Sequence, residues 1–133
     1  MEARIVEVLK ECTSGSEAGR LSFPEVLGLL SAVGVERYRA DLVRAEKTYY
    51  FANGESHVVP CAALTTPFAQ EFAPDAIERA IRASQGKQIG YPEFCARAAA
   101  AGCVDYLVSL TGRRAVYVGR TGETHVEPFP VAR

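Results

Sequence analysis

Hydrophobic positions change their spacing twice along the first half of the chain. Apolar residues between Ile5 and Cys12 recur at the three- to four-residue spacing of an amphipathic helix, and a second helical pattern follows Ser22. From Tyr38 to Leu42 apolar residues alternate with polar ones, which is typical of a strand with one buried face. The pattern therefore predicts two helices followed by β-structure.

Short signals mark where these helices begin and end. Ser22 can cap the second helix while Glu25, three residues later, reaches back to the Ser22 amide. Gly34 provides the left-handed conformation that helix ends favour, and Gly15 is expected to end the first helix. The first helix is therefore expected to end at Gly15, with one buried face.

The segments KTYYF and GESHVV predict a β-hairpin around Asn53-Gly54. This dipeptide is the strongest short hairpin signal, because both residues of a two-residue turn need positive φ. Such a turn places Tyr50 opposite His57 and leaves Glu55 on the same face of the sheet. The first half of the chain therefore predicts the element order α-α-β-β-β.

The second half of the chain repeats the first. Residues 21–60 align without a gap on residues 89–128, at a constant shift of 68 positions. Twelve of the 40 aligned positions are identical, which indicates a duplication rather than chance. A weaker match extends to the first helix, so we expect repeats of about 2–60 and 74–128 joined by a link over 61–73.

These elements predict an α+β fold in one domain over residues 1–133. Two tandem α-α-β-β-β repeats are expected to be related by a pseudo-twofold axis, with the helices packed on the apolar face of an antiparallel sheet. The spacing leaves open whether the six strands form one sheet or two.

The composition narrows the class of protein. Of the 133 residues 48% are apolar, and 16 acidic residues nearly balance 15 basic ones, giving a net charge of −1. This balance argues against a general nucleic-acid binder, because affinity for phosphates needs a surplus of cations. No apolar run approaches the ~18 residues of a membrane-spanning helix, so we expect a cytoplasmic protein without a membrane partner.

Motifs for nucleotide binding, serine hydrolysis, zinc peptidases and calcium loops are absent from the sequence. The cysteines are widely spaced, contain no C-x-x-C pair and are expected to be reduced and buried. They are Cys12, Cys61, Cys95 and Cys103. No catalytic residue, cofactor or metal ion is assigned from these patterns.

One polar motif, Gly-Glu-Ser/Thr-His-Val, occurs in both repeats. Glu55 with His57, and Glu123 with His125, are expected to project in pairs from one strand face. Imidazole and carboxylate together suit proton transfer or a divalent metal, provided that the pseudo-twofold brings both pairs together. The stronger alternative is that both are ordinary surface pairs, copied by the duplication.

Polar residues gather on the outward face of the first repeat. Arg37, Arg39, Asp41 and Tyr50, with Glu55 and His57, are the candidate ligand contacts, whereas a solvated strand face is the favoured alternative. A nucleic-acid contact through residues 37–47 is weakened by the interleaved acids.

The matching face of the second repeat carries apolar residues. Leu107 and Val118 stand there, and they suggest a patch covered by the other repeat or by another subunit, as in a homodimer.

A resemblance to a known family rests on three segments of the chain. They are the run GVERYRADLVRAEKTYYFANGESHVVP, the FPE upstream of it and a closing Y-x-V-x-x-x-G-E-T-H-V hairpin. The chain resembles the YbcV-like family of small bacterial proteins, some encoded on prophages and sometimes labelled phage envelope proteins. The resemblance covers nearly the whole chain and is most specific over 34–60. It implies no activity, substrate or cofactor.

Three functions are therefore compatible with the sequence. The favoured one is a binding or interaction module that uses the polar face of its sheet. The alternatives are a small enzyme or metal-binding protein centred on the Glu-x-His pairs, and a nucleic-acid contact through residues 37–47.

Overall fold

The computed structural model describes residues 1–130 and confirms the predicted α+β order. The first repeat comprises α1 (Ala3–Glu17), α2 (Phe23–Ala32), β1 (Val35–Asp41), β2 (Glu46–Phe51) and β3 (Ser56–Pro60). The second comprises α3 (Pro74–Gln85), α4 (Tyr91–Ala100), β4 (Cys103–Ser109), β5 (Arg114–Gly119) and β6 (Thr124–Pro128). Among the described residues no helix is long and apolar enough to cross a bilayer.

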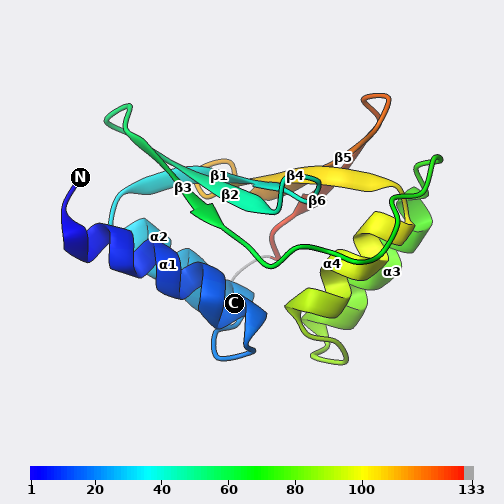
Figure 1. The fold of residues 1–133 in the computed structure, drawn as a ribbon, viewed down its shortest axis with the longest axis horizontal. Coiled ribbons are helices and arrows are strands. Elements are labelled where there is room, and N and C mark those ends of the chain that lie inside the picture. The colour runs from blue at the N-terminus through cyan, green and yellow to red at the C-terminus, as the bar shows by residue number, and fades with distance from the viewer. Residues whose placement is uncertain (131–133) are drawn as a thin grey trace.

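All six strands form one antiparallel sheet, in the order β3-β2-β1-β4-β5-β6. All four helices lie on the same side of it, with α1 and α2 in one pair and α3 and α4 in the other (Figure 1). The question that the sequence left open is thus answered by a single sheet with one helix-covered face and one open face.

The pairing of β1 with β4 joins the two repeats. Arg39 lies opposite Leu107, which is its own counterpart in the repeat alignment, so the pseudo-twofold axis passes between these two residues. The β1–β2 and β4–β5 ladders share one register, including an irregularity at Val35/Arg37 and its counterpart Cys103/Asp105. The hairpins that carry the two histidines consequently lie at opposite edges of the sheet.

The core fills the space between the sheet and the helices. It is one continuous cluster drawn from both repeats, with Leu9, Leu30 and Ile77 of the helices fully buried. Four tyrosines occupy equivalent core-facing positions in the two repeats, as the alternation predicts: Tyr38, Tyr49, Tyr106 and Tyr117.

The start of α2 agrees with the sequence prediction, whereas the end of α1 differs from it. Ser22 and Glu25 form the predicted capping box at the start of α2. Gly15, however, does not end α1, which continues to Glu17. A side chain at Gly15 would come within 2.7 Å of Leu21, so this glycine permits close packing of the following loop instead.

The hairpin register differs from the expectation by one residue. Tyr49, not Tyr50, lies opposite His57, and a three-residue loop replaces the two-residue turn. Only Gly54 of that loop has positive φ, whereas a two-residue turn needs two such residues. His57 therefore faces the helices, and Glu55 lies opposite Phe51 where it closes the loop, before β3 begins.

The link between the repeats packs along the end of α4. Ala69 and Ala73 donate backbone hydrogen bonds to the carbonyls of Ala99 and Ala101, at 3.0 and 2.8 Å. Gly102 follows with a φ of 87°, and a Cβ atom there would lie 2.2 Å from the Glu71 carbonyl oxygen. Its counterpart Gly34 has a φ of 91° but nothing within 3.8 Å of that position.

We therefore expect two matched substitutions to differ in cost. Gly34→Ala should lower the free energy of unfolding by about 1–2 kcal/mol through its left-handed backbone alone. Gly102→Ala should cost about 1–3 kcal/mol more, because the link must also move away. Urea denaturation of both variants measures this difference, and equal losses would show that the link does not hold Gly102 in place.

Candidate functional site

A cleft between the two repeats brings together side chains from both. It measures about 240 Å³ and lies where the end of α1, the β1–β2 turn, the start of the link and the first turns of α4 meet. Its walls include Glu17, Leu42, Cys61, Leu64, Tyr91 and Cys95. Apolar and ionisable side chains thus line the same small space.

Lys47 is buried behind this wall, with only 3% of its surface exposed. The residue lies on the helix-facing side of β2, between Ala40 of β1 and Val59 of β3. Its amine lies 4.4 Å from the centre of the Tyr91 ring and 5.7 Å from that of Tyr38. Among residues 1–130 this amine has no hydrogen-bond acceptor and no carboxylate within 4 Å.

Burial favours the uncharged form of this lysine. Desolvation lowers the pKa of the Lys47 amine, and the nearby Cys61, Cys95 and Glu17 oppose the shift without cancelling it. Burial also raises the pKa of the Cys61 thiol to about 11, although Lys47 acts in the opposite direction. The site therefore favours a neutral amine beside protonated thiols.

The amine also retains a small contact with solvent. Every fully shielded side-chain nitrogen or oxygen in the described part of the chain has a hydrogen-bond partner, so the unpartnered Lys47 amine is not fully shielded. Four of the residues around the amine also line the cleft: Glu17, Cys61, Tyr91 and Cys95. The amine is thus separated from the cleft only by residues of its wall.

The pseudo-twofold generates a second corner with the opposite chemistry. Lys47 and Cys61 correspond to Ala115 and Phe129, while Tyr91 and Cys95 correspond to Phe23 and Leu27. In that second corner the rings of Phe23 and Phe129 pack edge to face, with centroids 5.6 Å apart. Each chemically reactive residue of one corner is therefore replaced by an apolar residue in the other.

The sequence contained one signal for this site that the prediction missed. Lys47 falls on the apolar side of the alternating KTYYF segment, with Tyr49 and Phe51, and aligns with Ala115. A charged residue at a core position is rarely buried without a partner. The other cleft residues come from three distant segments, which no local pattern brings together.

Arg37, Arg39, Asp41 and Tyr50 lie on the open sheet face, because the alternating Tyr38 and Ala40 are buried. The Arg37 guanidinium stacks over Tyr50 at 3.9 Å, and Arg39 forms a 2.8 Å ion pair with Asp105 across the repeat boundary. Asp41 also lines the cleft.

Basic residues between 37 and 47 do not form a free cationic row. Arg39 is paired with Asp105, Arg44 with Glu46 at 2.8 Å, and Lys47 is buried. Such pairing leaves little positive charge for a phosphate backbone, so this geometry does not favour the nucleic-acid alternative.

The two Glu-x-His pairs do not converge. Their hairpins lie at opposite sheet edges, five strand spacings or about 24 Å apart, so the joint site that the sequence suggested is wrong. His125 instead lies 2.9 Å from Glu78 of α3, and Glu123 contacts the Thr121 amide of its own turn. Val59 stands two residues after His57, whereas the acidic Glu127 stands two residues after His125.

The residues around His125 form an ion-pair network. Glu78, His125 and Glu127 offer ligand atoms within 4.8 Å of one another, which is compatible with a metal ion. Arg82, however, bonds both carboxylates, at 2.9 Å in the case of Glu127. Since a cation would have to displace this guanidinium, the cluster is better explained as the link between α3 and β6.

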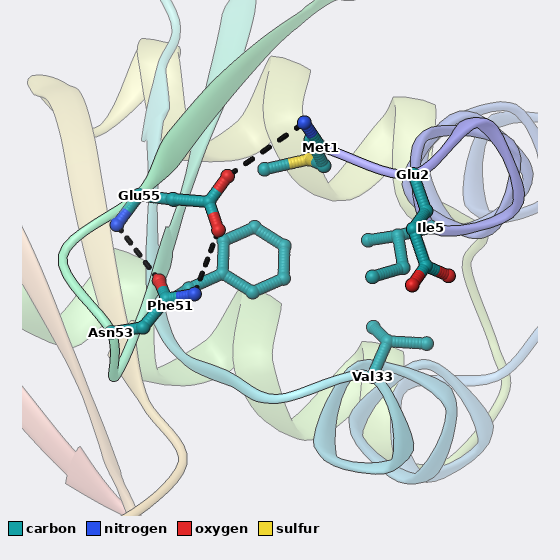
Figure 2. Close-up of a pocket in the computed structure, with 7 residues that line it drawn as sticks. All are labelled: Met1, Glu2, Ile5, Val33, Phe51, Asn53 and Glu55. Atoms are coloured by element: carbon teal, nitrogen blue, oxygen red, sulfur yellow. Dashed lines mark hydrogen bonds and ion pairs between the residues drawn. The ribbon is translucent and has the colours of Figure 1, made fainter.

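A second hollow, of about 470 Å³, lies between the β2–β3 turn and the start of α1 (Figure 2). Glu55, a predicted ligand residue, lies at its edge and accepts a 2.7 Å hydrogen bond from Asn53. The same carboxylate lies 3.8 Å from the Met1 amine. These polar groups already pair with one another, so this hollow lacks an unpartnered group like the Lys47 amine that lies behind the wall of the 240 Å³ cleft.

Comparison with known proteins places most of this structure in one family. A family model described as "Protein of unknown function (DUF1398)" matches residues 20–127, from the α1–α2 loop to β6. The matched range includes Lys47, Cys61, Tyr91 and Cys95. No curated protein sequence matches the chain.

The buried amine gives a stability prediction with a defined sign. The pKa of Lys47 is lower in the folded chain than in the unfolded one. Burying the charged amine therefore lowers the free energy of unfolding at pH values below the pKa of the unfolded chain, and this loss disappears above that pKa. Lys47→Met should therefore raise the free energy of unfolding by about 1–3 kcal/mol near neutral pH. This gain should shrink as the pH rises toward about 10.4, where an exposed lysine loses its proton.

Urea denaturation across this pH range measures the gain. The buried thiols and tyrosines titrate in both proteins and largely cancel in the difference, while Lys10→Met, at an exposed lysine, serves as the matched control. A Lys47→Met variant that is less stable than the wild type at every pH would mean that the amine has a stabilising partner.

Proposed function

The chain belongs to the family of proteins of unknown function DUF1398, and we propose that it binds a small organic molecule in the Lys47 cleft. One observation carries this proposal: a buried lysine amine without a hydrogen-bond acceptor or ion-pair partner lies behind the wall of a cleft. A polar group in that position costs folding free energy, and such costs concentrate at functional sites.

The dimensions and walls of the cleft define the ligand. A space of 240 Å³ corresponds to about eight water molecules, so the ligand is a small metabolite rather than a nucleotide. An oxygen acceptor, as in a carbonyl or carboxylate, would supply the hydrogen-bond partner that Lys47 lacks. Leu42, Leu64 and the Tyr91 ring would contact an apolar remainder.

Titration with three small probes tests this assignment by amide NMR. Butyrate or butanone should shift the amide signals of Leu42, Ala62 and Cys95, whereas butylamine, which offers no oxygen acceptor, should not. Cys61→Phe should abolish the shifts, because it reproduces the filled corner at Phe129, and Cys61→Ser should retain them. No response of these amides to any probe, or an unchanged response in Cys61→Phe, would refute the small-molecule site.

The open sheet face supports a second candidate function, self-association. Val58 and Val126 are 47% and 45% exposed, and they lie in one row across the sheet with Leu107 and Val116. Thr48 and Arg39 stand between Val58 and Leu107 in this row. No helix covers this face (Figure 1). A second copy of the chain, packed sheet to sheet, would cover these apolar side chains. The interaction module predicted from the sequence is proposed in this form.

Light scattering across a dilution series tests the homodimer. The mean mass of the wild type should rise toward that of two chains as the concentration increases, and Val116→Lys should remain a single chain at the same concentrations. Lys47→Met serves as the control, since it changes the opposite face and should self-associate like the wild type. A wild type that stays monomeric throughout would rule this candidate out. The prophage association implied by the resemblance stays a prediction.

A further inference from the structure

We propose that the cleft takes a small aldehyde or ketone and that Lys47 captures it covalently as an imine. This inference rests on the proposed small-molecule site and adds the chemical class of its ligand. It starts from the surroundings of the amine, which offer aromatic faces and thiols, while the nearby Glu17 carboxylate lies beyond ion-pair distance.

Burial favours the neutral, reactive form of this lysine relative to an exposed one. An ammonium ion in this position would face the Tyr91 ring at 4.4 Å and a small area of solvent, but among residues 1–130 it would find no hydrogen-bond acceptor or carboxylate for its three N–H groups. A neutral amine needs no counter-ion and has a free electron pair, which makes it a nucleophile. The ionisable groups that face it come from four elements: Tyr38 on β1, Cys12 and Glu17 on α1, Cys61 on the link, and Tyr91 and Cys95 on α4.

The neighbouring thiols are weaker candidates for the same role. A thiol reacts as its thiolate, and burial raises the pKa of Cys61 to about 11 and also raises that of Cys95. Near neutral pH these groups therefore remain protonated. Lys47 is consequently the better nucleophile of the cleft.

The reaction needs no oxidant, reductant or cofactor. The amine nitrogen adds to the carbonyl carbon, the carbonyl oxygen gains a proton and the nitrogen loses one, which gives a carbinolamine. The carbinolamine then loses its hydroxyl group from carbon and its remaining proton from nitrogen. Together they form water, and a carbon–nitrogen double bond is left.

One proton donor and one proton acceptor for these steps lie in the wall of the same cleft. Burial raises the pKa of the Tyr91 hydroxyl, which therefore stays protonated and lies 2.5 Å from the hydroxyl of Tyr106. The Glu17 carboxylate is held at the cleft by the Ala62 amide, at 2.7 Å, and can accept a proton. Both groups belong to the wall that a bound carbonyl compound would touch.

The chain contains only three lysines, Lys10, Lys47 and Lys87, so the proposal can be tested on the unmodified protein. Butanal with cyanoborohydride converts each imine into a stable N-butyl amine, and peptide mass spectrometry then locates it. Lys47 should be modified faster than Lys10 or Lys87 near pH 7, because a lowered pKa leaves a larger share of the amine neutral. Burial without reactivity would instead make Lys47 the slowest of the three, and that result would overturn the proposal.

Three variants and the pH dependence complete the test. Lys47→Arg and Cys61→Phe should both remove the fast adduct, whereas Lys10→Arg should leave it unchanged. The advantage of Lys47 over Lys10 should shrink as the pH approaches about 10.4, where exposed lysines become neutral.

If butyrate shifts the cleft amides but Lys47 gains no adduct from butanal, the imine is wrong and the binding site stands. If no probe shifts those amides and no fast adduct forms, both proposals fail.

Discussion

Antiparallel pairing of β1 with β4 is the interaction on which the rest of this structure depends. It places Arg39 opposite its own counterpart Leu107 and so fixes the pseudo-twofold axis in the middle of the sheet. Each repeat alone would have three strands and a helix pair, with an exposed edge at β1 or β4. Their pairing removes both of these edges, aligns the four helices on one side and creates the corners where the repeats meet.

Those corners show how one copy of a duplicated unit can contribute apolar packing while the other copy holds reactive side chains. The pseudo-symmetry provides the same backbone framework twice, and one copy is filled by Phe23 and Phe129. In the other copy, smaller or polar side chains leave a cleft next to Lys47. Because the filled corner supplies apolar packing, the open corner can retain a residue that costs folding free energy.

The two sheet faces divide the remaining chemistry. On the helix-covered face, low solvent access gives Lys47 and the surrounding thiols and tyrosines their shifted pKa values. On the open face, Arg39 and Asp105 remain an ordinary ion pair with partial solvent contact. The polar residues that stand out in the sequence are therefore mostly those that solvent and mutual pairing already satisfy. Lys47, the residue with the most unusual surroundings, is marked in the sequence only by its position in the alternating KTYYF segment.

Local patterns carry much of this architecture. The duplication, the order α-α-β-β-β, the Ser22 cap and the buried tyrosines all follow from spacings within a few residues, because helix and strand periods and capping geometry are local properties. The hairpin register does not follow in this way, since a difference of one residue in the loop moves His57 to the other face. Nor does the site: Lys47, Cys61 and Tyr91 meet only because the strand order stacks segments from both repeats around one corner. The alternation of β2 places Lys47 on its apolar side, but which groups surround the amine is decided only by the assembled environment.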